Sequence, residues 1–321
     1  MKKVCFIVPI ESDMKEKFTA LCEEHGYTAD FFDEKLKSAA DYAHYEVIVG
    51  TPSPHDLSGA DSLRYLHLSM AGSDAFVKDG VFSHPVLLSN SSGAFGHAIG
   101  EHLMGMLYSL YKKLHLYRDN QQRCRWHDEG TVRSIYGTSV LVVGMGDIGS
   151  SFAKTAAALG MHVSGIRRTT TEKPDYIENM YRPDELKAVI GRFDVVVLAL
   201  PETPQTHRLF DEEMIAAMKD GSVLLNVGRG SAVVTDALIA ALNSGKLYGA
   251  GLDVTDPEPL PADSPLWQCR NCLITPHVSG FFHLRQTYDA IVALAYENLS
   301  LYFDGKTPKN VVDFKTGYRK A

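Results

Sequence analysis

Three glycines spaced as G-x-G-x-x-G form the clearest chemical motif of this 321-residue chain. They follow the apolar run 140–143 and precede a predicted helix at 150–159, the order in which a strand, a glycine turn and a helix bind the pyrophosphate of a dinucleotide. We expect Gly144 to form the tight turn, Gly146 to let the backbone approach the pyrophosphate and Gly149 to allow close helix packing. A merely glycine-rich turn is the alternative, but the context favours dinucleotide binding. The motif comprises Gly144, Met145, Gly146, Asp147, Ile148 and Gly149.

Two arginines follow the next predicted strand, where many dinucleotide sites have an acid. That strand ends at Ile166, and Arg167, Arg168 and Thr169 come next. In NAD-binding versions a carboxylate about 20 residues after the glycines accepts hydrogen bonds from the ribose 2′-hydroxyl. Guanidinium groups would instead pair with a 2′-phosphate, so the sequence favours NADP over NAD as the cofactor. The alternative is that one arginine simply lies solvated on the surface.

Five further segments follow the glycine motif in a characteristic order. Together they make the chain resemble the D-isomer-specific 2-hydroxyacid dehydrogenases over nearly its whole length. The resemblance therefore points to glyoxylate and hydroxypyruvate reductases, D-lactate dehydrogenases, phosphoglycerate dehydrogenases and a few redox-sensing corepressors. The segments are 200–206 (LPETPQT), 218–221 (MKDG), 226–230 (NVGRG), 251–261 (GLDVTDPEPLP) and 275–280 (TPHVSG).

The resemblance implies three catalytic residues. It makes Arg229 the substrate-binding arginine, His277 the acid/base and Glu258 its carboxylate partner. The chemistry suits these residue types, because hydride transfer to a 2-keto acid builds negative charge on an oxygen that a fixed cation stabilises and a histidine protonates. A carboxylate at the other ring nitrogen would favour the imidazolium. Each residue alone could be an ordinary surface or loop group, but the matching set favours catalysis.

The resemblance also suggests cofactor and substrate contacts. The segment 69–74 (SMAGSD) resembles a loop whose backbone N–H groups bind the substrate carboxylate. Its expected binding residues are Met70, Ala71 and Gly72, and a strand-ending turn is the alternative. Thr206 and Asp253 are expected at the nicotinamide end of the cofactor, with Asp253 at the carboxamide. The other expected cofactor contacts are Leu200, Pro201, Val227, Gly228 and Gly280.

Two positions before the glycine motif carry further expectations. Gly100 stands where the family usually has Ala, so we expect a looser start to the helix that contains it. Trp126 occurs where the family often has a tryptophan, and packing in a core or an interface is its expected use.

Two groups of potential metal ligands predict no metal site. Cys269 and Cys272 form a C-x-x-C without the second pair that a zinc site needs, so a structural loop is favoured. His97, Glu101 and His102 match neither H-E-x-x-H nor H-x-x-E-H.

The elements that must position these residues alternate along the chain as in an α/β fold. We predict two Rossmann-like or flavodoxin-like domains, each a doubly wound parallel sheet, with a cleft between them. Residues 1–96, completed by 284–321, form the substrate domain, and residues 97–283 the NAD(P)-binding domain. A single helix at 99–116 is predicted between them. The predicted strands are 4–8, 47–49, 63–68, 85–88, 140–143, 162–166, 194–200, 222–227, 249–254 and 273–275.

Composition excludes several classes of protein. Hydrophobic residues make up 45% and charged residues 22%, which indicates a globular protein, and the net charge of −7 disfavours nucleic acid as a partner. The apolar run 4–10 contains Pro9 and is too short for a secretion signal, and no stretch is long enough for a membrane helix. Five cysteines suggest no disulfide framework, so we expect a cytoplasmic protein with reduced thiols.

These observations lead to one expected activity. The chain is expected to reduce a small 2-keto acid, such as glyoxylate or hydroxypyruvate, to the (R)-2-hydroxy acid with NADPH, NAD(H) being a possible substitute. By resemblance, it is expected to form a homodimer. Two alternatives stay open, namely a dinucleotide-sensing corepressor-like protein and a dehydrogenase for a bulkier 2-keto acid.

Overall fold

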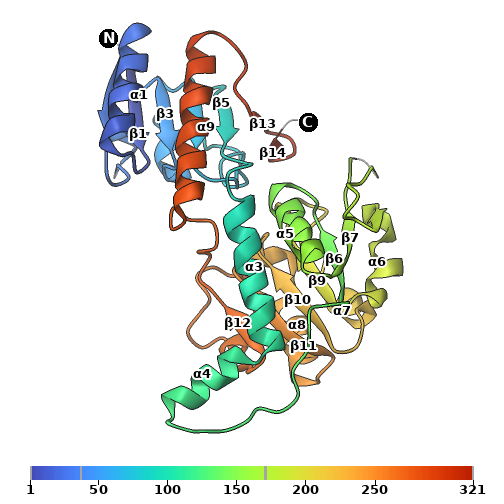
Figure 1. Cartoon of the computed structure of the whole chain (residues 1–321). Coiled ribbons are helices and arrows are strands. Elements are labelled where there is room, and N and C mark those ends of the chain that lie inside the picture. The colour runs from blue at the N-terminus through green and yellow to red at the C-terminus, as the bar shows by residue number, and fades with distance from the viewer. Residues whose placement is uncertain (1, 37, 170–171, 320–321) are drawn as a thin grey trace. The chain divides into compact units, whose positions relative to one another are not determined.

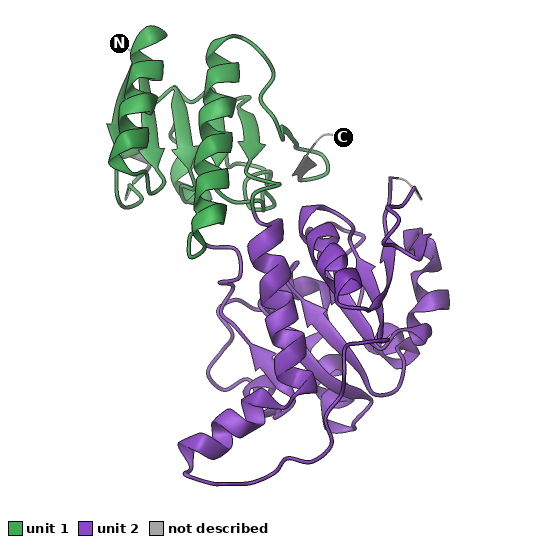
Figure 2. Ribbon diagram, viewed as in Figure 1, with its two compact units in different colours: residues 1–94, 282–321 green, residues 95–281 purple. Residues whose placement is uncertain are grey.

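The chain divides into two compact units (Figure 2). Unit 1 comprises residues 1–94 and 282–321, and unit 2 comprises residues 95–281. The computed structural model describes residues 2–36, 38–169 and 172–319, so the outermost ends of the predicted substrate domain, residues 1 and 320–321, lie outside the described residues. Each unit contains a sheet of parallel strands flanked by helices (Figure 1), which confirms the predicted α/β fold class.

Unit 1 contains a five-stranded sheet in the order β2-β1-β3-β4-β5, the order typical of flavodoxin-like folds. Its strands are β1 (Lys2–Ile7), β2 (Tyr27–Phe31), β3 (Val47–Gly50), β4 (Tyr65–Leu68) and β5 (Leu87–Asn90). Its other elements are α1 (Ser12–Glu24), α2 (Ala39–Tyr42), the 3-10 turn η1 (Pro54–Leu57), α9 (Arg285–Phe303) and the antiparallel pair β13 (Val312–Asp313) and β14 (Tyr318–Arg319).

Successive residues of β1 supply two different cores of unit 1. Val4 and Phe6 pack with residues of α1 and α9, which lie on the same side of the sheet (Figure 1). Cys5 packs into the cluster on the other face, together with Tyr42 and Leu57. Because successive strand side chains point to opposite faces, a strand that is apolar throughout is buried on both sides.

Unit 2 contains a seven-stranded sheet in the order β12-β11-β10-β9-β6-β7-β8. Its strands are β6 (Ser139–Val143), β7 (His162–Ile166), β8 (Asn179–Tyr181), β9 (Val195–Leu198), β10 (Ser222–Asn226), β11 (Leu247–Leu252) and β12 (Cys272–Ile274). Its helices are α3 (Gly96–Tyr111), α4 (Leu114–Gln122), α5 (Asp147–Ala158), α6 (Leu186–Val189), α7 (Glu212–Ala217) and α8 (Thr235–Asn243). Its 3-10 turns are η2 (Pro183–Glu185), η3 (Ile190–Arg192), η4 (Gly230–Ala232) and η5 (Pro265–Gln268).

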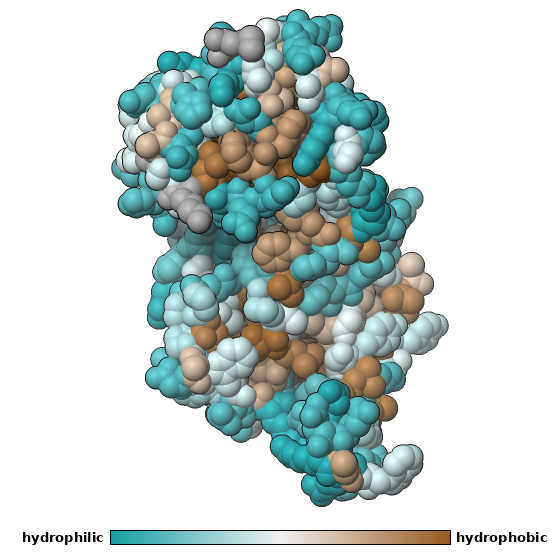
Figure 3. Space-filling view, turned by 90° about the vertical axis from the view of Figure 1, so that its left-hand side faces the viewer, coloured by the Kyte–Doolittle hydropathy of each residue, from teal (hydrophilic) through white to brown (hydrophobic). Residues whose placement is uncertain are grey.

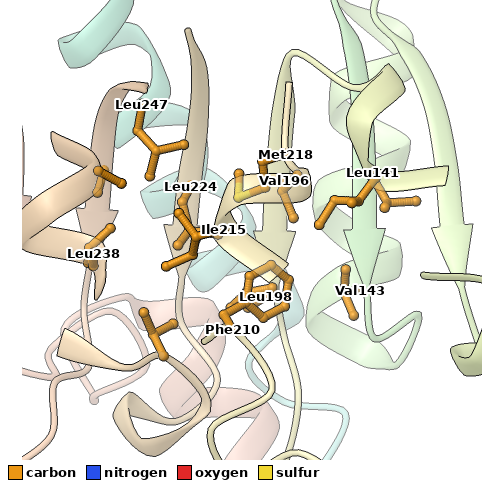
Figure 4. Packing of buried hydrophobic residues seen from close by; sticks show 14 of the residues in the cluster. Leu141, Val143, Val196, Leu198, Phe210, Ile215, Met218, Leu224, Leu238 and Leu247 are labelled. Carbon is orange, nitrogen blue, oxygen red and sulfur yellow. The ribbon is translucent and has the colours of Figure 1, made fainter. Parts of the chain in front are cut away.

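One face of this sheet packs against α6, α7 and α8. Figure 4 shows part of that core, in which Phe210 and Ile215 pack with strand residues such as Leu198 and Leu224. The opposite face is covered by α3 and α5, which pack closely on each other. Strand order reverses between β6 and β9, and ligands of open α/β sheets bind beyond the carboxyl ends of strands at such a switch point.

The structure corrects the predicted helix at 99–116. Helix α3 begins earlier, at Gly96, and ends at Tyr111, and α4 starts at Leu114. The break falls at Lys113, whose left-handed backbone (φ 56°) is incompatible with a continuous helix. A regular apolar spacing crosses this break, so periodicity alone could not reveal it.

Several short elements were absent from the sequence prediction. Strands β2 and β8 and the pair β13–β14 are additional, and the strand predicted at 85–88 lies instead at Leu87–Asn90. These strands are short or only partly buried, so they lack the continuous apolar runs that reveal β1 and β6.

The expectation about Gly100 is corrected. Gly100 does not loosen the start of α3, because it lies inside the helix, where a Cβ would come within 3.3 Å of the Phe152 backbone nitrogen of α5. The missing side chain therefore lets the two helices approach. Trp126 lies in no core of the chain, because its side chain is fully exposed, and its packing in an interface stays a prediction.

Hydrophobic and hydrophilic residues share the surface of the described chain. On the face shown in Figure 3, hydrophobic patches lie among hydrophilic residues. No helix within residues 2–36, 38–169 and 172–319 is long and apolar enough to cross a membrane.

Candidate functional site

The glycine loop after β6 is the first part of the site, and its close contacts require glycine. Gly144 has a φ of 106°, and a Cβ there would lie 2.4 Å from the carbonyl oxygen of Ala199. A Cβ on Gly149 would lie 2.1 Å from the carbonyl oxygen of Gly144. Gly146 directly precedes α5, whose first N–H groups are those that a helix leaves unpaired. The loop thus combines a tight turn with a helix start suited to an anion.

The carboxyl end of β7 lies directly beside this loop. The backbone N–H groups of Gly144 and Met145 both donate to the carbonyl oxygen of Ile166, at 3.2 and 3.3 Å. The exposed residues Arg167, Arg168 and Thr169 follow immediately. The structure therefore brings together the two features from which the sequence predicted a dinucleotide, namely the glycine loop and the arginine pair.

Within the glycine motif, the Asp147 side chain has a role that the sequence did not reveal. Its carboxylate accepts a hydrogen bond of 2.8 Å from the N–H of Gly96, the first residue of α3. A Cβ on Gly96 would lie 2.5 Å from the same carboxylate. Asp147 therefore caps α3 in addition to starting α5. Its neighbour Ile148 is partly buried in the first turn of α5. No local pattern links residues 96 and 147, so sequence reasoning could not find this contact.

The ends of β9 and β10 form the next part of the same sheet edge. After β9, the hydroxyl of Thr206 donates to the carbonyl oxygen of Pro201 at 2.7 Å and closes a turn. A Cβ on Gly228 would lie 2.5 Å from the carbonyl oxygen of Leu200, and the N–H of Val227 donates to Leu198 at 3.1 Å. The predicted cofactor residues that follow β9 and β10 are therefore neighbours.

Arg229 follows this close contact, in a turn that the buried Asn226 holds. The Asn226 side chain donates to the carbonyl oxygen of Arg229 at 2.9 Å and accepts from the N–H of Gly228 at 3.0 Å. Arg229 is partly buried, and its Nη1 donates to the carbonyl oxygen of Gly228 at 2.8 Å. Asn226 was not among the predicted site residues, although its position within NVGRG was available as a signal.

Glu258 and His277 form a direct pair. Glu258 Oε2 lies 2.9 Å from His277 Nδ1, and the side chains are 39% and 47% exposed. Glu258 Oε1 accepts from the N–H of Thr255 at 3.0 Å. Gly230 packs so tightly on Thr255 that a Cβ would lie 1.9 Å from its carbonyl oxygen, which links the Arg229 turn to the Glu258 loop. With Nδ1 engaged, the ring leaves Nε2 for a reactant.

Asp253 follows β11 and contacts the segment that carries His277. Its side chain is 1% exposed and accepts from the N–H groups of Val278 and Ser279 at 3.0 and 3.1 Å. The hydroxyls of Thr275 and Ser279 donate to it at 2.6 and 2.5 Å. Both carboxylate oxygens therefore organise the segment that carries His277. The contact of Asp253 with a carboxamide stays a prediction, and Thr275 and Ser279 are additional residues of the site.

Gly280 ends this segment against α3. A Cβ there would lie 3.0 Å from Ile99 Cδ1 and 3.3 Å from Phe95 Cδ1. The structure thus gives Gly280 a packing role, and its contact with a cofactor stays a prediction.

The predicted substrate loop belongs to unit 1 and follows β4. The N–H of Ser91 donates to the carbonyl oxygen of Met70 at 3.0 Å, and the Asn90 side chain donates to that of Ala71 at 2.7 Å. In a trans peptide the C=O and the following N–H point in opposite directions. The N–H groups of Ala71 and Gly72 therefore both point away from β5, as an anion-binding loop requires.

The structure gives ordinary environments to Cys269, Cys272 and His97, three of the residues that the sequence disfavours as metal ligands. Cys269 is buried and Cys272 partly buried, and burial, reinforced by Cys269, raises the pKa of the Cys272 thiol to about 12. His97 pairs with Glu101 on the surface of α3 at 3.3 Å. Within the described residues, no cluster of three or more His, Cys, Asp or Glu could hold a metal ion.

Comparisons with known proteins identify the family of this chain. The model of the family "D-isomer specific 2-hydroxyacid dehydrogenase, NAD binding domain" matches residues 104–279. A glyoxylate/hydroxypyruvate reductase B from Shigella sonnei is 31% identical over 288 residues, which cover 86% of this chain and 87% of the relative.

Two solved structures extend the likeness to the whole chain. A D-isomer specific 2-hydroxyacid dehydrogenase family protein from Aeromonas salmonicida is 29% identical, with a TM-score of 0.84 over 98% of this chain and 99% of that one. A D-isomer specific 2-hydroxyacid dehydrogenase from Xanthobacter autotrophicus, in complex with NADPH and MES, is 27% identical, with a TM-score of 0.81 over 99% of each chain. The glycine loop, the ordered motifs and these matches together show that the chain belongs to the D-isomer-specific 2-hydroxyacid dehydrogenases, a family that uses a nicotinamide dinucleotide.

Proposed function

We propose that this protein reduces a small 2-keto acid of the glyoxylate or hydroxypyruvate type to the (R)-2-hydroxy acid with NADPH. The observation that carries the proposal is the contact of 2.9 Å between His277 Nδ1 and Glu258, which leaves Nε2 for the reacting oxygen. The name of the Shigella sonnei relative supports the substrate class.

Three side chains perform the chemistry in this proposal. The bound dinucleotide supplies the hydride, and Arg229 holds the substrate carboxylate and stabilises the oxygen on which charge develops. His277 donates the proton from Nε2 to that oxygen. Glu258 keeps the imidazole in one orientation and stabilises its charged form.

The proposal assigns further contacts to the cofactor and to the substrate. Unit 2 binds the cofactor in this proposal, and Ala71 and Gly72 of unit 1 offer their N–H groups to the substrate carboxylate. The domain bounds predicted from the sequence, 1–96 with 284–321 and 97–283, are proposed as the functional division. A homodimer joined through unit 2 stays a prediction, which light scattering of the purified protein tests.

The preference for NADPH rests on two exposed cations. Arg167 and Arg168 follow β7 next to the glycine loop, and guanidinium groups match the geometry of a 2′-phosphate. The structure from Xanthobacter autotrophicus, which contains NADPH, supports this choice. Replacing both arginines with Asp should raise the KM for NADPH much more than that for NADH. The control is Arg192→Asp, an exposed arginine just before β9 at the opposite, amino end of the strands.

The decisive experiment follows the absorbance of NADPH and NADH with glyoxylate, hydroxypyruvate, pyruvate and bulkier 2-keto acids. We expect rapid oxidation of NADPH with glyoxylate or hydroxypyruvate. Turnover confined to bulky 2-keto acids would replace the proposed substrate class. Tight NADPH binding without turnover on any substrate would favour a dinucleotide-sensing protein instead.

A further inference from the structure

One histidine excluded as a metal ligand is joined to the candidate site by a chain of hydrogen bonds. His102 of α3 is 24% exposed, and its Nε2 lies 3.0 Å from the hydroxyl oxygen of Thr275. That hydroxyl lies 2.6 Å from Asp253 Oδ1. The direct distance from His102 Nε2 to Asp253 Oδ1 is 3.9 Å.

The chemistry of these groups fixes the direction of the chain. An ionised carboxylate only accepts hydrogen bonds, so the Thr275 hydroxyl donates its proton to Asp253. The Thr275 oxygen then has only acceptor capacity left, and His102 must donate to it from a protonated Nε2. His102 therefore orients the hydroxyl that orients the carboxylate.

Asp253 in turn fixes the backbone around His277. Its carbonyl oxygen accepts from the N–H of His277 at 2.7 Å, and its carboxylate holds the N–H groups of Val278 and Ser279. His277 has a φ of 53°, a left-handed conformation that is strained in a non-glycine residue and persists only when the surroundings impose it. The buried carboxylate supplies that constraint on the side of the chain that follows His277.

We propose that His102 is a positioning residue for His277 and acts through Thr275 and Asp253. The inference rests on the proposed function, because it takes His277 as the proton donor. Loss of the donor at residue 102 frees the Thr275 hydroxyl to rotate and loosens the carboxylate that holds residues 277–279. The imidazole then spends less time aligned with the reacting oxygen, which lowers kcat.

The first test compares two substitutions of His102 with a matched control on the same helix. His102→Leu removes the donor, and we expect kcat to fall about 10-fold with a smaller change in KM for the keto acid. His102→Gln keeps an N–H donor close to the position of Nε2, and kcat should largely recover. His97→Leu removes an exposed histidine of α3 that contacts Glu101, and kcat should stay unchanged.

A second pair of variants keeps the inference testable if His102→Leu fails to fold. Thr275→Ser retains the hydroxyl and should retain kcat, whereas Thr275→Val has the same shape without it and should lose activity about as His102→Leu does. Thermal unfolding of each variant shows whether a lower kcat comes with a general loss of stability. A merely structural role would not be rescued selectively by the Gln and Ser side chains.

The possible outcomes separate the inference from the proposed function. Wild-type kcat in His102→Leu or Thr275→Val, alongside an inactive His277→Ala, overturns the positioning role and leaves the proposed function intact. Equal loss in His102→Leu and His102→Gln also overturns it, because the donor is then irrelevant. Full activity in His277→Ala overturns the proposed function itself.

Discussion

The two units have similar sheets but opposite chemistry at their carboxyl edges. In unit 2, β6 leads through a glycine turn into α5, whose N-cap is Gly146. In unit 1, β1 leads through Pro9 to Glu11 at the start of α1, and Glu11 pairs with Arg285. Proline lacks an N–H, so the turn after β1 offers a phosphate fewer backbone donors than the glycine turn after β6 does. The first strand–turn–helix of unit 2 therefore suits a dinucleotide, and that of unit 1 does not.

Two histidines express the same contrast. His277 is half exposed and contacts Glu258, an arrangement that suits proton donation. His67 on β4 is fully buried among neutral partners, including the hydroxyls of Ser89 and Ser91, and burial lowers its pKa to about 3. The first is available for chemistry, and the second is a neutral part of a core. Two residues of the same type therefore differ in role because their surroundings differ.

The largest effect is expected at His277. His277→Ala should lower kcat about 10²- to 10⁴-fold, the usual contribution of a general acid, because no other group donates the proton in our proposal. NADPH binding, measured by fluorescence titration, should change little. A kcat near that of the wild type would mean that His277, like His67, has no role in catalysis.

The next largest effect is expected at Gly149 of the glycine loop. Gly149→Ala places a methyl group against the Gly144 carbonyl, so we expect a loss of about 1–3 kcal/mol in unfolding free energy and at least about 10-fold weaker NADPH binding. Gly105→Ala in α3 is the control, because nothing lies within 4 Å of its Cβ and alanine should stabilise the helix by about 0.5–1 kcal/mol. Unaltered NADPH binding in Gly149→Ala would contradict the assignment of this loop.

Glu258→Gln tests the partner of His277. Loss of the charge should lower kcat about 10-fold at neutral pH, because the amide no longer stabilises the imidazolium. The matched control is Glu101→Gln, which alters an exposed histidine–carboxylate pair on α3 and should leave kcat unchanged. Equal kcat values in the two variants would show that Glu258 is also an ordinary surface acid.

The last effect concerns the stability of unit 1 and not activity. Because the pKa of His67 is about 3 in the folded state and near 6.5 when unfolded, the unfolded chain binds the extra proton between these values. The contribution of His67 to the free energy of unfolding should therefore fall as the pH falls, by up to about 1.4 kcal/mol per pH unit between pH 6.5 and 3. Urea unfolding at several pH values measures this slope.

Two variants isolate His67 in that measurement. His67→Gln should flatten the slope, whereas His55→Gln should keep it, because the His55 side chain is 97% exposed. An unchanged slope in His67→Gln would assign the pH dependence to other groups.

Sequence reasoning worked best where the signal was local. The buried strands of both sheets, the fold class and the motifs around residues 144, 229, 258 and 277 were all visible, because continuous apolar runs and fixed spacings survive in one dimension. The helix break at Lys113 was missed, because a left-handed backbone at one residue leaves no trace in the apolar spacing on either side of it.

The sequence by itself therefore determined the family, the fold class and the residue types available for catalysis. Only the tertiary structure decided that Asp147 caps α3, that Asn226 holds the turn of Arg229 and that His102 reaches Asp253 through Thr275. The physical reason is that hydrogen bonds act over about 3 Å in space, and the open parallel sheet brings together strand ends that lie far apart along the chain.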